Sequence, residues 1–268
     1  MEKSDITIIG IVKGSPAEKA ELRLNDKIVA INGENCSDLS LTQVAERMKV
    51  KAGTTVTLSI DRDGEMIEKD VVTENIVFKS VYSENMDGIG YIQISSFDEN
   101  TGNEFVEAYN KLREENITGL VVDVRDNGGG IYDEAIKIAK VLVPKGLIVY
   151  TEDKDGNRKS DNSEGDGIDI PLVLLINEES ASASEILAGA IKDRGCGTLV
   201  GKKTYGKGVV QGWYMIGDGT SIKITIAKYF TPSGVCIQDI GIEPDVEVEN
   251  TSAYKDLQLE RAIKLLKK

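Results

Sequence analysis

Apolar and polar residues follow two different rhythms along this chain, and the rhythm changes near residue 75. Before that point, short runs rich in β-branched residues predict four strands. These runs are ITIIGIV (6–12), KIVAIN (27–32), TTVTLSI (54–60) and MIEKDVV (66–72). Between them, SLTQVAERMKV (40–50) repeats apolar residues at helical spacing and predicts a helix that Ser40 caps.

From residue 76 onward, strands and helices alternate, which favours a layered α/β core. Predominantly apolar runs at 119–125 and 171–177 predict strands that are buried on both faces. Other predicted elements are strands at 89–95 and 147–151, a β-hairpin over 213–230, a helix that carries Phe105, Tyr109 and Leu112, and helices at 132–143, 183–191 and 257–266. The polar, glycine-rich segment 152–170 is predicted to be a mobile surface loop.

Composition narrows the class of protein. A chain of 268 residues can bury a sizeable core, and its net charge of −13 argues against a nucleic-acid partner. No apolar run approaches the roughly 20 residues that span a bilayer, and the first residues lack the apolar core of a signal peptide. The three cysteines are widely spaced, which argues against a zinc or redox motif. The chain contains no histidine, so acid–base chemistry must come from carboxylates, lysine, tyrosine or cysteine.

A cluster of serines lies where a buried apolar run meets a predicted helix, at positions 180, 182 and 184. Ser182 and Glu185 match the S-x-x-E capping box, which satisfies free amides at a helix start. The same place suits a nucleophile, because the amides beside it can hold a developing oxyanion. The neighbouring residues alone leave both interpretations open.

Residues 201–208, GKKTYGKG, approach a phosphate-binding loop, but three features exclude a nucleotide site. Gly208 replaces the metal-binding hydroxyl, the following VVQGWYMI is strand-like rather than helical, and the acidic strand precedes the loop. Lys207, held between two glycines, is then unexplained. A lysine can replace histidine as the base for a serine when its amine is neutral.

Three consecutive glycines, Gly128 to Gly130, follow one of the buried strands in VRDNGGGIYDEA. A tight strand-to-helix turn needs only one glycine. Three of them indicate that something approaches the backbone closely, such as a phosphate or an oxyanion.

Taken together, the motifs resemble those of the C-terminal (tail-specific) processing proteases, Ser–Lys peptidases of family S41 that carry a PDZ domain. GSPAEKAELRLNDKIVAING resembles the family's PDZ segment. The remaining motifs follow in the family's order: IGYIQISSFDENTGNEF, VVDVRDNGGG, VLLINEESASASEILAGAIKDRG, VGKKTYGKGVVQ and AKYFTPSGVCIQDIGIEPDVEV. The resemblance covers nearly the whole chain.

The resemblance implies roles for individual residues. Ser182 matches the nucleophile, Lys207 the general base and Gln211 the residue that orients the lysine. The oxyanion hole is expected from the amide of Ala183 and from the glycine turn, where Gly129 is the better match and Gly130 the second.

The implied fold is α/β, with a PDZ-like domain over residues 1–75 and a crotonase-like, Clp-protease-like core over 76–268. The PDZ-like domain would bind peptides through Leu41, Val44 and Met48, although its first strand and carboxylate-binding loop are not visible in the sequence. Glu21 and Asn25 stand where the family has glycines, so the local turn is expected to differ.

The expected function is hydrolysis of peptide bonds near the C-termini of proteins through an acyl-enzyme, without a metal or other cofactor. Homodimerisation and export from a bacterial cell are implied by the resemblance only. The alternative is a silent or gated relative that binds peptides without cutting them.

Overall fold

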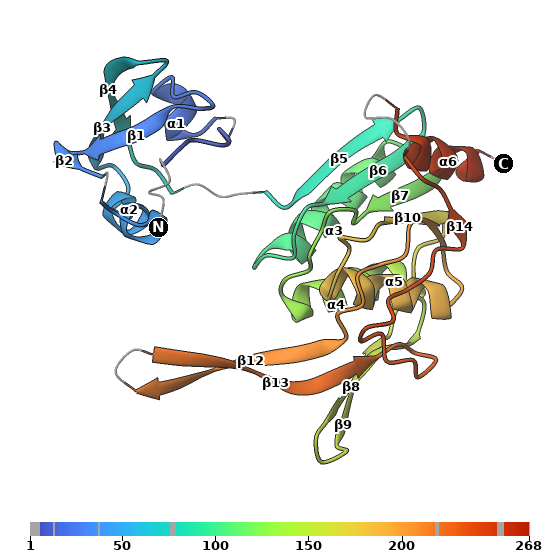
Figure 1. The fold of residues 1–268 in the computed structure, drawn as a ribbon. Helices are drawn as coiled ribbons and strands as arrows, with labels where there is room; N and C mark the ends of the chain where they lie inside the picture. Colours follow the sequence, from blue (N-terminus) through green and yellow to red (C-terminus); the bar gives the residue numbers. More distant parts are fainter. Residues whose placement is uncertain are drawn as a thin grey trace. The chain divides into compact units, whose positions relative to one another are not determined.

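The structure is a computed structural model that describes residues 6–12, 14–36, 38–75, 79–217, 220–250 and 255–267. Its backbone contacts divide the chain into two compact units, Met1–Phe78 and Lys79–Lys268 (Figure 1). Both units combine strands with helices, as the α/β prediction requires. Among the described helices, none is both long and apolar enough to cross a membrane.

The N-terminal unit is a four-stranded antiparallel sheet in the order β2-β1-β3-β4 with two helices. Its elements are α1 (Pro16–Lys19), β1 (Lys27–Ile31), β2 (Glu34–Asn35), α2 (Leu41–Met48), β3 (Thr55–Arg62) and β4 (Glu65–Val72). The helix and three of the four strands predicted here are confirmed, and Ser40 caps α2 as expected. The small core is formed by Leu22, Ile31, Cys36, Val44, Val56, Leu58 and Ile60.

The strand predicted over residues 6–12 is wrong. Only Thr7 forms a β-bridge, to Lys27, and Ile9 is 93% exposed. The hydrogen bonds of Ile8 go to Asn25 and Asp26. Because Asn25 has a positive φ of 70°, these partners lie in a turn, and a regular ladder does not continue past it.

The turn around residues 21–25 keeps a left-handed backbone without glycine. Glu21 has φ 58°. This backbone conformation is energetically unfavourable for any residue that carries a side chain. Side chains of the sheet hold it there: Arg62 donates to the Glu21 carbonyl at 3.0 Å, and Lys69 binds the Glu21 carboxylate at 2.9 Å.

Asp26 is the buried anchor of this unit, since its side chain is only 1% exposed. Arg62 binds both of its carboxylate oxygens, at 2.7 and 2.8 Å, and the Arg23 amide adds a bond of 2.8 Å. The hydrogen bonds from Arg62 hold the pKa of Asp26 below its ordinary value, although burial acts in the opposite direction.

Acid is therefore expected to destabilise the N-terminal unit. A carboxylate whose pKa is lower in the folded state contributes stability that is complete above its unfolded pKa of about 3.9. This stability is lost as the pH falls through the lower folded value. Asp26→Asn should lower the free energy of unfolding at neutral pH by about 2 kcal/mol and flatten the acid dependence, as measured by urea denaturation. Glu68→Gln removes an exposed charge from β4 and is the control; equal behaviour of the two variants would contradict the assignment.

The C-terminal unit is built on a six-stranded sheet in the order β14-β11-β10-β7-β6-β5. All neighbouring pairs are parallel except β5 with β6. The strands are β5 (Val81–Met86), β6 (Ile89–Ile94), β7 (Gly119–Asp123), β10 (Leu172–Ile176), β11 (Thr198–Gly201) and β14 (Val246–Glu247). The helices are α3 (Thr101–Glu114), α4 (Tyr132–Leu142), α5 (Ala183–Asp193) and α6 (Leu257–Leu266).

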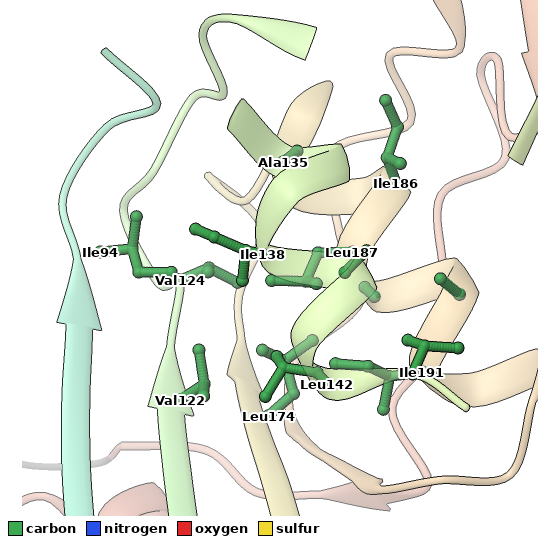
Figure 2. Packing of buried hydrophobic residues seen from close by; sticks show 14 of the residues in the cluster. Ile94, Val122, Val124, Ala135, Ile138, Leu142, Leu174, Ile186, Leu187 and Ile191 are labelled. Atoms are coloured by element: carbon green, nitrogen blue, oxygen red, sulfur yellow. The ribbon is translucent and has the colours of Figure 1, made fainter. Parts of the chain in front are cut away.

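Helices cover both faces of this sheet. On one face, Val122 and Leu174 pack with Ile138 of α4 and Leu187 of α5 (Figure 2). On the other face, the preceding residue of β7, Val121, joins a second apolar cluster with Ala262 and its neighbours on α6. The prediction that the apolar runs of β7 and β10 are buried on both faces is confirmed, because every residue of both strands is buried.

A second sheet of this unit has the antiparallel order β12-β13-β8-β9. Its strands are β8 (Gly146–Asp153), β9 (Arg158–Ser163), β12 (Val209–Gly217) and β13 (Thr220–Phe230). The predicted hairpin over 213–230 is confirmed, and β12 begins earlier, at Val209. Figure 1 shows the β12–β13 ribbon extending away from the helices of the unit.

The prediction of a loop over residues 152–170 is wrong in part, because Arg158–Ser163 form β9. Asp153 stabilises the turn before it by accepting the amides of Asp155 and Asn157 at 2.8 and 2.9 Å. Arg158 then lies over the Tyr150 ring and binds Glu152 at 2.7 Å. These cross-strand contacts order a segment whose composition resembles a loop.

Candidate active site

Three turns of the C-terminal unit meet at a cavity of about 300 Å³. The glycine turn after β7, the start of α5 and the segment that leads from β11 into β12 all contribute to its wall. Parallel strands place their carboxyl ends at one edge of a sheet, where ligand sites of α/β proteins commonly lie. Ser182, Lys207 and Gln211 all line this cavity.

Ser182 has a strained backbone, with φ 57° and ψ −112°. Such angles are rare for a residue with a side chain and cost of order 1–3 kcal/mol. Strained residues of this kind cluster at functional sites, where the surrounding structure enforces them. The conformation places the residue directly before α5 with its side chain at the cavity.

The neighbouring serines have structural roles. Ser180 is fully buried, and its hydroxyl donates to the Val124 carbonyl at 2.7 Å. Ser184 is also fully buried, and its hydroxyl donates to the Asn127 carbonyl at 2.9 Å. Of the three serines in the cluster, Ser182 is the one that lines the cavity.

Glu185 connects the turn of Ser182 with the turn of Lys207. At the start of α5, the Glu185 half of the predicted capping box is formed, since one Glu185 oxygen accepts the Ser182 amide at 2.9 Å. The same oxygen accepts the Lys207 amide at 2.8 Å. The other accepts the Gly206 amide at 2.7 Å and the Thr204 hydroxyl at 2.6 Å. One fully buried carboxylate thus holds the backbones of both candidate residues.

Lys207 is half-buried at the cavity wall. Within the described residues, its hydrogen bonds use its backbone, and no acidic side chain pairs with its amine. Position 208, which follows Lys207, requires a glycine for steric reasons, since a Cβ on Gly208 would lie 2.4 Å from the Gln238 amide nitrogen. The segment continues as strand β12 and not as a helix, which supports the exclusion of a phosphate-binding loop.

The glycine turn lies against Ser182. A Cβ on Gly129 would be 2.8 Å from the Ser182 Cβ and 2.7 Å from the Ala181 carbonyl, so only glycine fits. Asn127 fixes this turn: its side chain donates to the Ile94 carbonyl at 2.7 Å and accepts the Gly129 amide at 2.8 Å. The Gly129 amide is therefore already engaged.

Two other amides are better placed to stabilise an oxyanion. Ala183 begins α5, so its N–H is one of the four that have no partner inside the helix. Gly130 forms a β-bridge with Phe97, in which the Gly129 carbonyl accepts the Phe97 amide and the Ile131 amide donates to the Phe97 carbonyl. The Gly130 N–H takes no part in this bridge and lies on the side away from Phe97. Both residues line the cavity, and no hydrogen bond in the described ranges uses either amide.

Gln211 is exposed on β12 and lines the cavity together with Lys223 of the paired strand β13. The PDZ-like candidates lie in the other unit, on α2. Val44 is 1% exposed and part of the core, Leu41 is 72% exposed, and Met48 packs partly against the core. Peptide binding by these three residues stays a prediction.

Sequence reasoning missed Tyr229 and Asn127, and it treated Glu185 only as a helix cap. The S-x-x-E spacing signals the bond of Glu185 to Ser182. The bonds of Glu185 to Gly206 and Lys207 join residues that lie 21 and 22 positions apart in the chain, and no local sequence pattern reveals them. The same holds for Tyr229, whose hydroxyl contacts the carbonyl oxygens of Ser182 and Lys207.

Comparisons with protein-family models and with individual known proteins agree with each other. The model of peptidase family S41 matches residues 88–248, and a PDZ domain model matches residues 7–62. The carboxyl-terminal-processing protease of Synechocystis sp. is 37% identical over 280 residues, which cover 99% of this chain and 66% of that protein. The chloroplastic C-terminal processing peptidase of Tetradesmus obliquus is 33% identical over 273 residues, which cover 95% of this chain and 59% of that protein.

Among solved structures, the photosystem II D1 C-terminal processing protease aligns with a TM-score of 0.62 and 30% identity. The alignment covers 100% of this chain and 73% of that one. Of the two curated relatives, this chain spans 66% of the length of the Synechocystis sp. protein and 59% of the length of the Tetradesmus obliquus protein.

Proposed function

The chain belongs to peptidase family S41, and we propose that it is a serine endopeptidase with Ser182 as nucleophile and Lys207 as general base. The observation that carries the proposal is the strained Ser182 at a helix start, in a cavity that is also lined by Lys207, whose amine has no acidic partner in the described residues. A lysine amine, when neutral, can take the proton of a serine hydroxyl.

The reaction begins when the neutral Lys207 amine takes the Ser182 proton and the serine oxygen attacks the peptide carbonyl. The carbonyl π electrons move to its oxygen, and the amides of Ala183 and Gly130 stabilise the resulting negative charge. Gln211 orients the lysine. The C–N bond then breaks, and the Lys207 ammonium returns its proton to the departing amine. Water, activated by the same amine, hydrolyses the acyl-enzyme and restores Ser182.

The substrates are protein chains cut near their C-termini, as the names of the relatives from Synechocystis sp. and Tetradesmus obliquus suggest. In this proposal, the PDZ-like unit binds the C-terminal tail of the substrate. Homodimerisation and export stay predictions from the family resemblance.

A serine-reactive fluorophosphonate probe tests the proposal on the purified chain. The probe is expected to label Ser182, as mapped by peptide mass spectrometry, and the same sample should cleave an unfolded protein such as casein. Labelling without turnover would favour the gated relative. Turnover after Ser182 is fully labelled would refute the assignment of the nucleophile.

A further inference from the structure

Tyr229 lies on β13, 2% exposed, with its ring in the main apolar cluster and at the cavity wall. Its hydroxyl donates to the Lys207 carbonyl oxygen and also lies 3.1 Å from the Ser182 carbonyl oxygen. A buried tyrosine hydroxyl usually has one polar partner. This one contacts both residues of the candidate dyad, which lie on different turns.

The contacts of Tyr229 complement those of Glu185. Glu185 accepts the amide hydrogens of Ser182 and Lys207, whereas Tyr229 contacts their carbonyl oxygens. The Ser182 carbonyl has further support from the amides of Glu185 and Ile186. For the Lys207 carbonyl, Tyr229 is the only partner within the described ranges. Both polar backbone groups of Lys207 thus depend on a buried side chain from another element.

The strand that carries Tyr229 is hydrogen-bonded to the segment that carries Lys207. Its own amide donates to the Gly208 carbonyl at 3.0 Å, and its neighbour Lys228 pairs with Val209 of β12. The strand that carries the ring is therefore tied to the residues that directly follow Lys207.

We propose that Tyr229 is a positioning residue, whose hydroxyl fixes the backbone of Lys207 beside that of Ser182 and so sets the spacing between base and nucleophile. The inference rests on the proposed Ser182–Lys207 function. Proton transfer between the two side chains needs a separation of about 3 Å, and a displacement of about 1 Å costs on the order of a hundredfold in rate. Burial raises the pKa of the Tyr229 hydroxyl, and the nearby Glu185 raises it further, so the hydroxyl stays a donor in mildly alkaline solution.

Tyr229→Phe removes the hydroxyl and keeps the ring that fills the core. It is expected to lower kcat roughly ten- to a hundredfold, with KM unchanged within about twofold. Turnover is measured on a labelled peptide and divided by the number of sites that a fluorophosphonate probe titrates. This normalisation removes the effect of any unfolded fraction, so the comparison holds even if the variant folds less completely.

Tyr91→Phe is the matched control. Tyr91 also donates a partly buried hydroxyl, to Asp123 at 2.8 Å, but it lies on β6 and contacts neither Ser182 nor Lys207. Its removal should cost stability and leave kcat per titrated site unchanged. A wild-type kcat per site in Tyr229→Phe, whatever its melting temperature, would overturn the inference. Turnover in Ser182→Ala would instead overturn the proposed function on which the inference rests.

Discussion

Ser182→Ala and Lys207→Ala are each expected to reduce turnover by at least about 10⁴-fold, because in the proposed mechanism each removes a group that takes part in forming the acyl-enzyme. When two residues act together in one step, removing the first already abolishes the contribution of the second. The double variant should therefore be no slower than the worse of the two single variants. Turnover of an unfolded protein substrate, followed by release of labelled peptides, measures all three.

The serines on either side provide the controls. Ser180→Ala and Ser184→Ala each remove a buried hydrogen bond to a backbone carbonyl, and each should cost about 1–3 kcal/mol of folding free energy. Per folded molecule, both variants should retain activity, because neither side chain lines the cavity wall where Ser182 lies. Full proteolysis by Ser182→Ala would exclude Ser182 as the nucleophile. Inactivity of a folded Ser180→Ala would show that the cluster acts in another way.

The strain at Ser182 explains why the sequence alone left its role open. A helix cap needs an extended backbone and a short polar side chain, and such a cap is common. Ser40 has this geometry, with φ −74° and ψ 159°. Ser182 has the same S-x-x-E/Q pattern but a positive φ, which a cap does not require. The pattern of residues is the same in the two places, and only the backbone distinguishes them.

Regular elements of the fold were largely predictable, because their apolar positions are periodic. The run of β10 is entirely apolar and that of β7 is apolar up to Asp123, and both strands are buried on both faces. Two strands with a largely polar composition, β5 and β9, were not predicted. Strand β9 reads as a loop and is ordered by Arg158 and Asp153, and β5 has only two apolar ends around a polar centre. Their order depends on partners that lie elsewhere in the chain.

The candidate site follows the same division. Ser182, Lys207 and the glycine turn were identified from motifs, because each motif is a continuous segment of the chain. Hydrogen bonding distinguishes the glycines: Gly129 has the closest contact with Ser182, but its amide is bound by Asn127. A hydrogen bond between a turn and a side chain two residues away leaves no mark in the composition. The oxyanion donors therefore change from Ala183 with Gly129 to Ala183 with Gly130 in the proposed mechanism.

Glu185→Gln is expected to lower kcat on the order of a hundredfold and the free energy of unfolding by about 2–4 kcal/mol. Each carboxylate oxygen of Glu185 accepts two donors, and a glutamine has only one oxygen to offer. If its amide nitrogen replaces the oxygen that binds Ser182 and Lys207, both of these N–H groups lose their acceptor. If it replaces the other oxygen, the Thr204 hydroxyl can turn, but the Gly206 N–H faces another donor.

Either orientation loosens the segment that carries Lys207, so the loss should fall on kcat more than on KM. Glu134→Gln separates this effect from general loss of stability. Glu134 is also a buried acid of the C-terminal unit, 4% exposed, and it accepts the Gly102 amide at 2.8 Å and binds Lys137 at 2.6 Å. Its substitution should lower the melting temperature while kcat per titrated site stays at the wild-type value. Similar losses of kcat per site in the two variants would mean that Glu185 stabilises the unit without positioning the dyad.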